Sequence, residues 1–426
     1  MTSSIQASYI FTLCFSIALL AGFLVRSYLS LRQAKHVALH RAEVPKAFAN
    51  KVSQTNHEKA ADYTLAKSRL GFWEDVLGCI VLVAWTLLGG LALLNAVVLE
   101  WLGGLGVQGF WQQIALLLAF TLIGSIIDLP LSLYQTFVLE ERFGFNKTTW
   151  KTWAVDLVKG LILGAVIGLP LIALVLYLMG AAGQNWWLWA WGALTLFTLF
   201  MMWIAPTVIM PLFNKFTPLE DEALKARVTA LMQRCGFNAS GFFVMDGSKR
   251  SAHSNAFFVG FGSTKRVVFY DTLLKQINID EMEAVLAHEL GHAHHKHIIK
   301  RMLMQFVVSF AGFALLGWLA TQSWFYTGLG VQPSLTGSHD ALALLLFMLA
   351  VPVFMFFVTP VFSWGSRKDE FQADAYAVKH SNGAALASAL LTLYEDNAST
   401  LTPDPLYMSF YASHPPATER LARLTA

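Results

Sequence analysis

The chain has 426 residues, of which 56% are hydrophobic and only 13% are charged, and its formal net charge is +3. An ordinary soluble domain contains about 25% charged residues, so this composition excludes a disordered chain and supplies too little charge to cover one soluble domain. A charge of +3 is also too small to indicate nucleic acid as a partner. We therefore expect a protein of the lipid bilayer.

Several stretches are apolar over the length of about 20 residues that a membrane-spanning helix needs. No Lys or Arg precedes the first of them and positive residues follow it, which predicts an uncleaved span and not a signal peptide. Asp156 and Lys159 lie one turn apart near one end of the fourth stretch, so we expect them to pair with each other. The seven predicted spans are residues 7–25, 76–99, 114–133, 153–179, 187–211, 303–325 and 341–363.

Lysine and arginine occur only in every second connection between these spans. Residues 26–73 hold nine of them and residues 212–302 hold twelve, whereas 100–113, 180–186 and 326–340 hold none. Loops rich in Lys and Arg stay on the cytoplasmic side of a membrane. We therefore expect a multi-pass protein with its N-terminus outside and every large polar segment in the cytoplasm.

The polar segments predict a division of the chain into four parts. Residues 1–211 form five spans with the cytoplasmic loop 26–73, and residues 303–363 form spans six and seven. The polar blocks 212–302 and 364–426 flank this last pair of spans. We expect the two blocks to come together as the halves of one catalytic domain in the cytoplasm.

The first polar block begins with an amphipathic pattern at residues 218–235, which predicts a helix. Three apolar segments follow and predict a small sheet of short strands: GFFVMD, NAFFVGFG and RVVFYD. A helix from about 281 to 299 comes next, and Asp280 with Glu283 resembles a capping box at its start. Later helices are expected at residues 366–380, 384–396 and 416–424.

Residues 288–292 spell H-E-x-x-H within the helix predicted at 281–299. Histidines four residues apart on a helix project from the same face, so His288 and His292 can share one Zn2+. Zinc makes a bound water more acidic, and Glu289 can take the proton as the water attacks a peptide carbonyl. The motif therefore favours a zinc endopeptidase over a charged helix surface.

A catalytic zinc site needs three protein ligands and one open position. Glu370 and Asp374 lie four residues apart on a predicted helix and can face the same way. Glu370 is then a candidate ligand, and Asp374 a candidate hydrogen-bond acceptor for a ligand histidine. Asp369 is a rival ligand on chemistry alone, and a solvated charged surface is the alternative for the whole segment.

Three more histidines, His294, His295 and His297, follow the motif closely. Such a group could bind a second metal ion. Histidines at the end of a helix also interact favourably with the negative end of the helix dipole. For His294 and His295 we favour this second interpretation.

At these residues the chain resembles the type I CAAX prenyl protease family, membrane zinc endopeptidases that process prenylated C-termini. The resemblance implies a mainly α, polytopic seven-helix membrane protein with an α+β zinc-metallopeptidase domain on the cytoplasmic side. It also implies one Zn2+ per chain and a peptide or protein substrate associated with the membrane. The similar segments are FGFNKTTW, IAPTVIMPLFNKFTPL, KRSAHSNAFFVGFG, HELGHAHHKH, SRKDEFQAD and YASHPPATERL.

The resemblance also implies roles for individual residues. Glu289 is the general base, Asp374 acts beside the ligands, and His414 stabilises the oxyanion. For His414 the alternative is a buried histidine bonded to the following loop. Asn255 and Ala256 hold substrate backbone beside an edge strand. The implied metal ligands are His288, His292 and Glu370.

Other classes of protein stay open at this point. An HtpX-like quality-control membrane protease shares H-E-x-x-H and E-x-x-x-D, although such chains have fewer spans. A non-catalytic membrane protein with a structural zinc would close the metal with four protein ligands and leave Glu289 without a task. A short loop between spans six and seven, and an end, RLARLTA, without an endoplasmic-reticulum return signal, favour a bacterial member in the cytoplasmic (inner) membrane.

Overall fold

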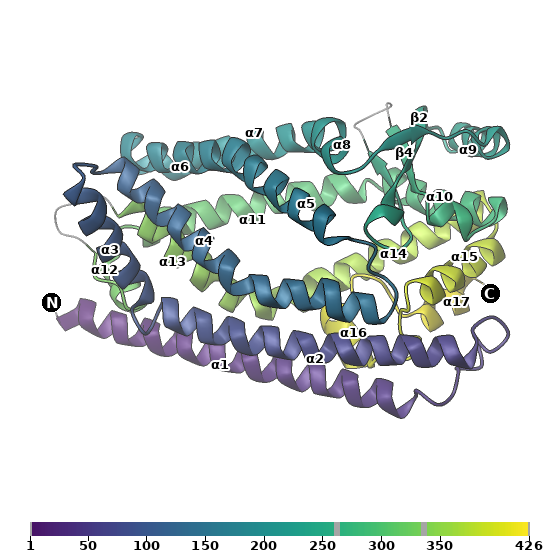
Figure 1. The fold of residues 1–426 in the computed structure, drawn as a ribbon, viewed down its shortest axis with the longest axis horizontal. Coiled ribbons are helices and arrows are strands. Elements are labelled where there is room, and N and C mark those ends of the chain that lie inside the picture. Colours follow the sequence, from purple (N-terminus) through teal and green to yellow (C-terminus); the bar gives the residue numbers. More distant parts are fainter. Residues whose placement is uncertain (1, 260–264, 334–338, 425–426) are drawn as a thin grey trace.

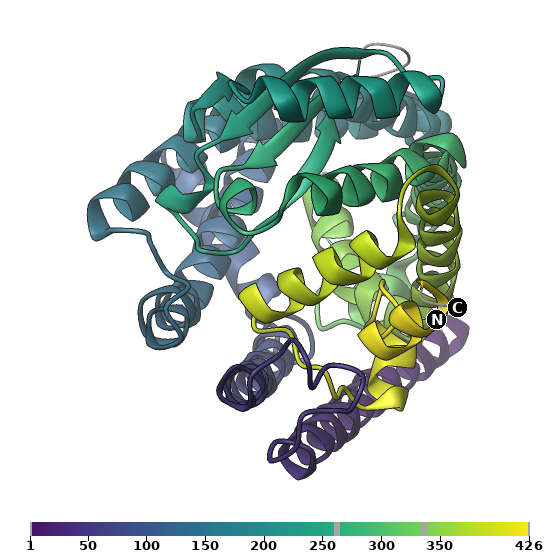
Figure 2. The same ribbon diagram turned by 90° about the vertical axis from the view of Figure 1, so that its right-hand side faces the viewer.

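The computed structural model describes residues 2–259, 265–333 and 339–424. Long helices run along the longest axis of the molecule, and the N-terminus and C-terminus lie at opposite ends of that axis (Figure 1). The small sheet and the C-terminal helices gather at one end, as the view onto that end shows (Figure 2). The fold is thus mainly helical with a small α+β part, as the sequence predicts.

The first half of the chain is almost entirely helical. Short π-helical turns at Gln135–Glu140, Gly164–Gly168 and Ala205–Ile209 continue the helices before them, so each continuous segment reaches about 30 residues. The helices are α1 (Thr2–Leu39), α2 (Gln54–Trp85), α3 (Gly90–Gly104), α4 (Phe110–Tyr134), α5 (Trp150–Leu163), α6 (Leu169–Ala181), α7 (Trp186–Ile204) and α8 (Met210–Phe213).

In the described part of the chain, six helical segments are long and apolar enough to cross a membrane, and the bent pair α2 and α3 makes a seventh. The predicted number of spans therefore agrees with the structure when this pair counts as one. The span predicted at 76–99 is not one continuous helix, because a bend of 54° separates α2 from α3. Gly89 has φ +76°, and a Cβ on Gly90 would lie 2.6 Å from the carbonyl oxygen of Ala84, so this turn requires glycine.

The sheet has four strands in the order β1–β2–β4–β3. β1 and β2 are antiparallel, β2 and β4 are parallel, and β3 pairs antiparallel with β4 at the edge. Three strands were predicted; the three residues of β1 are too few to show a pattern. Residues 260–262 of the predicted strand NAFFVGFG lie outside the described residues. The strands are β1 (Phe216–Pro218), β2 (Ala239–Met245), β3 (Ala256–Val259) and β4 (Lys265–Tyr270).

The helices of the second half of the chain differ from the prediction in two places. Residues 366–380, predicted as a separate helix, are the continuation of a longer helix that starts at Thr359, and Pro405–Tyr411 is a helix that was not predicted. The helices are α9 (Glu222–Arg234), α10 (Ile279–His294), α11 (His297–Leu319), α12 (Ser323–Thr327), α13 (Asp340–Met355), α14 (Thr359–His380), α15 (Gly383–Asp396), α16 (Pro405–Tyr411) and α17 (Ala417–Leu424).

The two ends of α10 differ from the prediction. The capping residue is Asn278, whose side chain accepts from the N–H of Glu281 at 3.0 Å while the Glu281 carboxylate accepts from the N–H of Asn278. Glu283, predicted as part of the cap, instead accepts hydrogen bonds from two arginines of α9. The helix ends at His294 and not near 299, because Lys296 adopts φ +57° and turns the chain.

A single apolar core joins segments that are far apart in the sequence. It includes Phe48 from the first polar loop, Leu231 from α9, Leu290 from α10 and Leu386 from α15. α10 packs extensively against α14 and also contacts α15. Both polar blocks therefore contribute to the same core, which positions α10 and α14 side by side.

The predicted pairing of Asp156 with Lys159 is wrong. The Asp156 carboxylate accepts two hydrogen bonds from Arg250, at 2.7 and 2.9 Å, and Lys159 donates to the carbonyl oxygen of Leu212 at 2.6 Å. A long-range partner has replaced the local one, because the segment before β3 packs onto the start of α5. This ion pair ties a membrane helix to the chain that leads into the edge strand.

Candidate metal centre

The candidate ligands come from two helices that touch. His288 and His292 lie on one face of α10, and Glu370 lies on α14. Gly291 sits between the histidines, and a Cβ there would come within 2.9 Å of the Cα of Ala373 on α14. Glycine therefore permits the close approach that brings Glu370 to the histidines.

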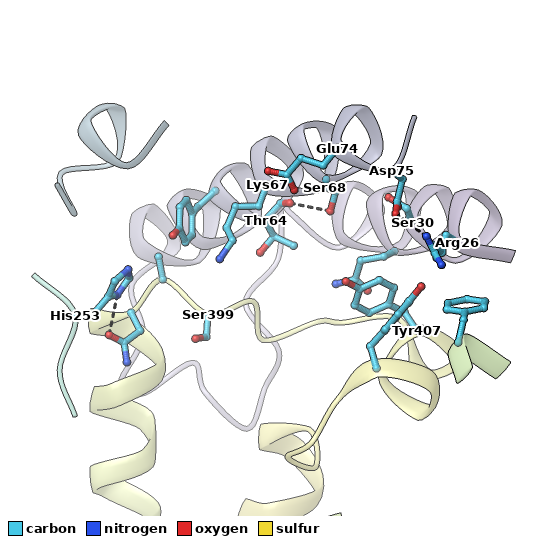
Figure 3. A pocket seen from close by; sticks show the side chains of 17 residues that line it. Arg26, Ser30, Thr64, Lys67, Ser68, Glu74, Asp75, His253, Ser399 and Tyr407 are labelled. Atoms are coloured by element: carbon cyan, nitrogen blue, oxygen red, sulfur yellow. Dashed lines mark hydrogen bonds and ion pairs between the residues drawn. The ribbon is translucent and has the colours of Figure 1, made fainter. Parts of the chain in front are cut away.

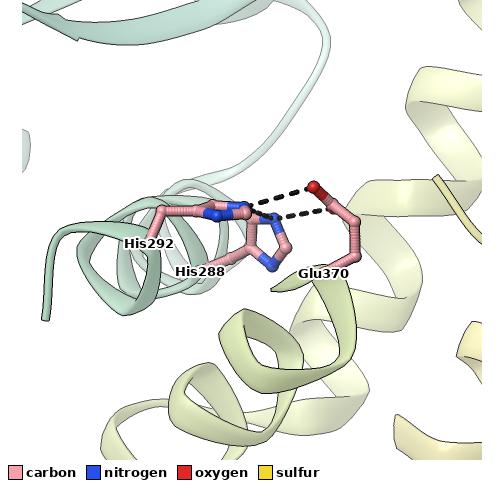
Figure 4. Close-up of side chains that lie close together, drawn as sticks. All are labelled: His288, His292 and Glu370. Carbon is pink, nitrogen blue, oxygen red and sulfur yellow. Dashed lines mark hydrogen bonds and ion pairs between the residues drawn. The ribbon is translucent and has the colours of Figure 1, made fainter. Parts of the chain in front are cut away.

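The three side chains converge on one point (Figure 4). The Nε2 atoms of His288 and His292 are 3.2 Å apart, and the Glu370 oxygens lie 3.4 Å and 3.3 Å from these two nitrogens. Bonds of about 2.0–2.1 Å to a tetrahedral zinc would place ligand atoms about 3.4 Å apart. Oε2 of Glu370 is buried without a hydrogen-bond partner. Within the described ranges, no other group of His, Cys, Asp and Glu is placed to hold a metal in this way.

The second nitrogen of His288 is held by an acid. Nδ1 of His288 lies 2.9 Å from Oδ1 of Asp374, and Arg420 donates two hydrogen bonds to the same carboxylate at 2.8 and 2.6 Å. Burial alone would lower the pKa of His288, but the neighbouring carboxylates of Asp374 and Glu370 outweigh burial and raise the pKa to about 9. The Asp374 and Glu370 carboxylates therefore place negative charge around His288, as a cation site requires.

Sequence reasoning missed Arg420. Its side chain is buried on the same face of α17 as Ala417 and Leu421. The available signal for Arg420 was its charge at a position where the helix pattern predicts an apolar residue, because a buried charge needs a partner. The sequence does not say that this partner is Asp374, 46 residues away.

A cavity of about 430 Å³ adjoins the metal ligands. Glu289 lines it and is half-buried, and burial raises the pKa of its carboxyl group. Asn255 and Ala256, at the start of the edge strand β3, line the same cavity. The Asn255 side chain accepts a hydrogen bond from the N–H of Ala256 at 2.8 Å. A peptide placed in this cavity would lie between the ligands and the edge strand.

His414 lines the same cavity from the other side. Its Nε2 lies 3.5 Å from Oε1 of Glu370, and its Nδ1 lies 2.9 Å from the hydroxyl of Ser413. The side chain is 62% exposed, so the alternative of a buried histidine bonded to the following loop is wrong. The ring is thus free to meet a ligand in the cavity.

The rival ligand Asp369 lies apart from the cluster. One of its oxygens accepts a hydrogen bond from Arg301 at 3.1 Å, and the other lies 3.5 Å from Nε2 of His297. His294 faces the ring of Tyr376, with 4.8 Å between the ring centroids. The geometry therefore brings Glu370, and not Asp369, to the two histidines of the motif.

A second cavity, of about 760 Å³, lies between α1, α2 and the C-terminal segment (Figure 3). His253 lies at one end of it, and the ion pair between Arg26 and Asp75 lies at the other. It shares Asn397 and Ser399 with the cavity at the metal ligands. The two cavities are therefore neighbours that a long substrate could occupy together.

Known proteins match this chain over nearly its whole length. Residues 33–215 match the family described as CAAX prenyl protease N-terminal, five membrane helices, and residues 218–426 match peptidase family M48. CAAX prenyl protease 1 homolog of Arabidopsis thaliana is 36% identical, over 94% of each chain. CAAX prenyl protease 1 of Saccharomyces cerevisiae is 35% identical, over 95% of this chain and 93% of its own.

The crystal structure of Ste24p from S. mikatae is similar throughout, with a TM-score of 0.88 and 34% identity. The two structures match over 97% of this chain and 98% of the Ste24p chain. Fold and site together define an integral-membrane zinc metalloprotease, an enzyme that hydrolyses peptide bonds. The chain belongs to peptidase family M48, among the CAAX prenyl proteases.

Proposed function

We propose that His288, His292 and Glu370 bind one Zn2+ per chain and that Glu289 is the general base of peptide-bond hydrolysis. The observation that carries this proposal is the meeting of three donor atoms at tetrahedral spacing beside a cavity that Glu289 lines. The orphaned, buried oxygen of Glu370 supports it, because such an atom is costly unless it has a partner.

The surrounding residues have distinct tasks in this proposal. A bound zinc ion supplies Lewis acidity at its open position. Glu289 takes a proton from the water molecule that attacks the peptide carbonyl and passes this proton to the leaving nitrogen. The raised pKa of Glu289 suits this role. Asp374 accepts from Nδ1–H of His288, so that Nε2 keeps its lone pair for the metal. His414 donates to the oxygen on which negative charge develops.

The edge strand β3 would bind substrate through backbone hydrogen bonds, beginning at Asn255 and Ala256. We propose a membrane-associated peptide or protein as substrate. The relatives are named for the CAAX prenyl motif, which supports a prenylated C-terminal segment as the first candidate. Cleavage of a prenylated peptide and its unprenylated twin by the purified protein would decide this point.

We propose the membrane orientation in which residue 1 lies outside and the catalytic domain lies in the cytoplasm. The alternation of Lys and Arg between loops supports it. The division into residues 1–211, 212–302, 303–363 and 364–426 is part of the same proposal. A bacterial origin, and with it the cytoplasmic (inner) membrane, stays a prediction from loop length.

Replacement of Glu289 by Ala tests the catalytic proposal. We expect the purified variant to keep one zinc per chain by metal analysis and to lose cleavage of an unfolded or prenylated peptide by about 100-fold or more. Glu222, an exposed acid of α9, offers the matched control, and Glu222→Ala should cleave like the wild type. Wild-type cleavage by Glu289→Ala would refute the assignment, and so would wild-type protein without bound metal.

A further inference from the structure

His297, the first residue of α11, lies directly against the ligand His292. Nδ1 of His297 is 2.9 Å from Nδ1 of His292, and His297 is only 1% exposed. On its other side, Nε2 of His297 lies 3.0 Å from Oε1 of Gln372 and 3.5 Å from Oδ1 of Asp369. The contact with His292 is therefore on the ring nitrogen that faces away from His288 and Glu370.

The break between α10 and α11 makes this contact. On a continuous helix, residues five apart would point about 140° away from each other, because each residue turns by about 100°. Lys296 adopts φ +57° and ends α10, so the chain folds back and His297 reaches the ring of His292. The turn costs backbone strain in a residue other than glycine.

The partners of His297 set the direction of the hydrogen bonds. A neutral imidazole has one N–H and one accepting nitrogen. The carboxylate of Asp369, held by Arg301 at 3.1 Å, can only accept, and it lies on the same side as the Gln372 oxygen. Nε2 of His297 therefore carries the hydrogen, and its Nδ1 accepts.

If Nδ1 of His297 accepts, then Nδ1 of His292 donates to it. Nε2 of His292 is then left with a lone pair that points toward His288 and Glu370. We propose that His297 is a positioning residue, which fixes the tautomer and ring orientation of His292 as Asp374 does for His288. The inference rests on the proposed metal site and adds His297, with Gln372 and Asp369 behind it, to that site's supporting residues.

The test is zinc affinity, measured by competition with a chromophoric chelator on the purified full-length protein. His297→Leu removes the acceptor, and we expect zinc to bind about 10- to 100-fold more weakly. His297→Gln restores an oxygen that can accept from His292 and should recover affinity to within a few-fold. His294→Leu, an exposed histidine on the neighbouring turn, is the matched control and should bind zinc like the wild type.

The outcomes separate this inference from the proposal on which it rests. Absence of zinc from the wild type would remove the proposed metal site, whereas wild-type affinity in His297→Leu would overturn only the role of His297. Equal losses in the Leu and Gln variants would also overturn it, because they would indicate packing and not hydrogen bonding.

A second pair of variants applies if His297→Leu fails to fold. Gln372→Met combined with Asp369→Ala removes both acceptors behind His297 and leaves its ring in place. Gln372→Glu keeps an acceptor there. We expect weaker zinc binding in the first and near wild-type binding in the second; equal affinity of the two would overturn the inference.

Discussion

Arg420 donates two hydrogen bonds to the carboxylate of Asp374, at 2.6 and 2.8 Å, and both side chains are buried. Asp374 in turn lies 2.9 Å from Nδ1 of the candidate ligand His288. Helix α17 is thus connected to the metal centre through Asp374, and Nη1 of Arg420 also lies 3.8 Å from Oε2 of the candidate ligand Glu370. This connection explains how residues far from the H-E-x-x-H motif can affect metal binding.

Replacement of Arg420 should weaken zinc binding although Arg420 is not itself a candidate ligand. Arg420→Met leaves the Asp374 carboxylate buried without its cation, which costs about 3–5 kcal/mol, and we expect about tenfold weaker zinc affinity. Arg420→Lys keeps the charge but not the paired geometry and should fall between Met and the wild type. Chelator competition and thermal unfolding measure both effects. Wild-type values in Arg420→Met would show that Asp374 needs no partner.

Removal of the metal should abolish cleavage and leave the helices intact. The helices that carry the ligands are also held by an apolar core that includes Leu286 and Leu290 of α10 and Ala377 of α14. We therefore expect treatment with a zinc chelator to stop peptide cleavage while the far-ultraviolet circular dichroism stays unchanged, and added zinc to restore cleavage. A large loss of helical signal on chelation would contradict this expectation.

Asp404 should make the stability depend on pH. Asp404 is 1% exposed and caps the N-terminus of α16. Its carboxylate oxygens accept a shared hydrogen bond from Nε of Arg32 on α1, at 2.9 and 3.0 Å. Burial opposes its ionisation, but hydrogen bonds from the backbone N–H of Tyr407 and from Arg32 outweigh burial and lower the pKa of Asp404. The stabilisation is therefore present above the ordinary pKa of about 4 and is lost as pH falls through the lowered value.

Asp404→Asn isolates this contribution. At pH 7 we expect the variant to unfold at a lower temperature, with a loss of about 2 kcal/mol. The difference from the wild type should begin to shrink below about pH 4, where the carboxyl group of the unfolded chain takes up a proton. It should vanish as pH falls through the lowered pKa of Asp404 in the folded protein. Glu419→Gln, an exposed acid on α17, is the control. A difference that stays constant with pH would rule out the charge of Asp404 as its cause.

The ion pair between Asp156 and Arg250 should affect substrate more than metal. Arg250 lies a few residues before the edge strand and is tied to α5 through Asp156. Arg250→Met should loosen this segment and lower kcat/KM by about tenfold, with zinc affinity unchanged. Lys249→Met, at the exposed neighbouring residue, should behave like the wild type. Loss of zinc from Arg250→Met would show that the ion pair acts on the whole domain.

The proposed topology can be tested with tags at the two ends of the chain. Seven crossings place the ends on opposite sides of the membrane, and the Lys and Arg pattern puts the C-terminus in the cytoplasm. We expect a tag at residue 1 to be accessible from outside in intact cells and a tag at residue 426 to be protected. The reverse labelling would overturn the orientation.

Several features could be predicted from the sequence because they depend on neighbouring residues. Apolar runs of about 20 residues predict the spans, and the spacing of His288 and His292 predicts that their rings share a helix face. The break at Gly89 and the cap at Asn278 were missed, although both are local. The Gly89–Gly90 pair is itself a turn signal that the apolar run around it masked, and Asp280 offered a rival cap two residues after Asn278.

By itself, the sequence determined the membrane class, the six to seven candidate spans and the H-E-x-x-H motif on one helix face, since hydropathy and helical periodicity act over a few turns of one segment. Only the tertiary structure decided which acid joins the histidines, that Arg420 supports Asp374, and that His297 turns back onto His292. Those pairings depend on how α10, α14 and α17 pack, and the energy of packing is shared among residues that are distant in the chain.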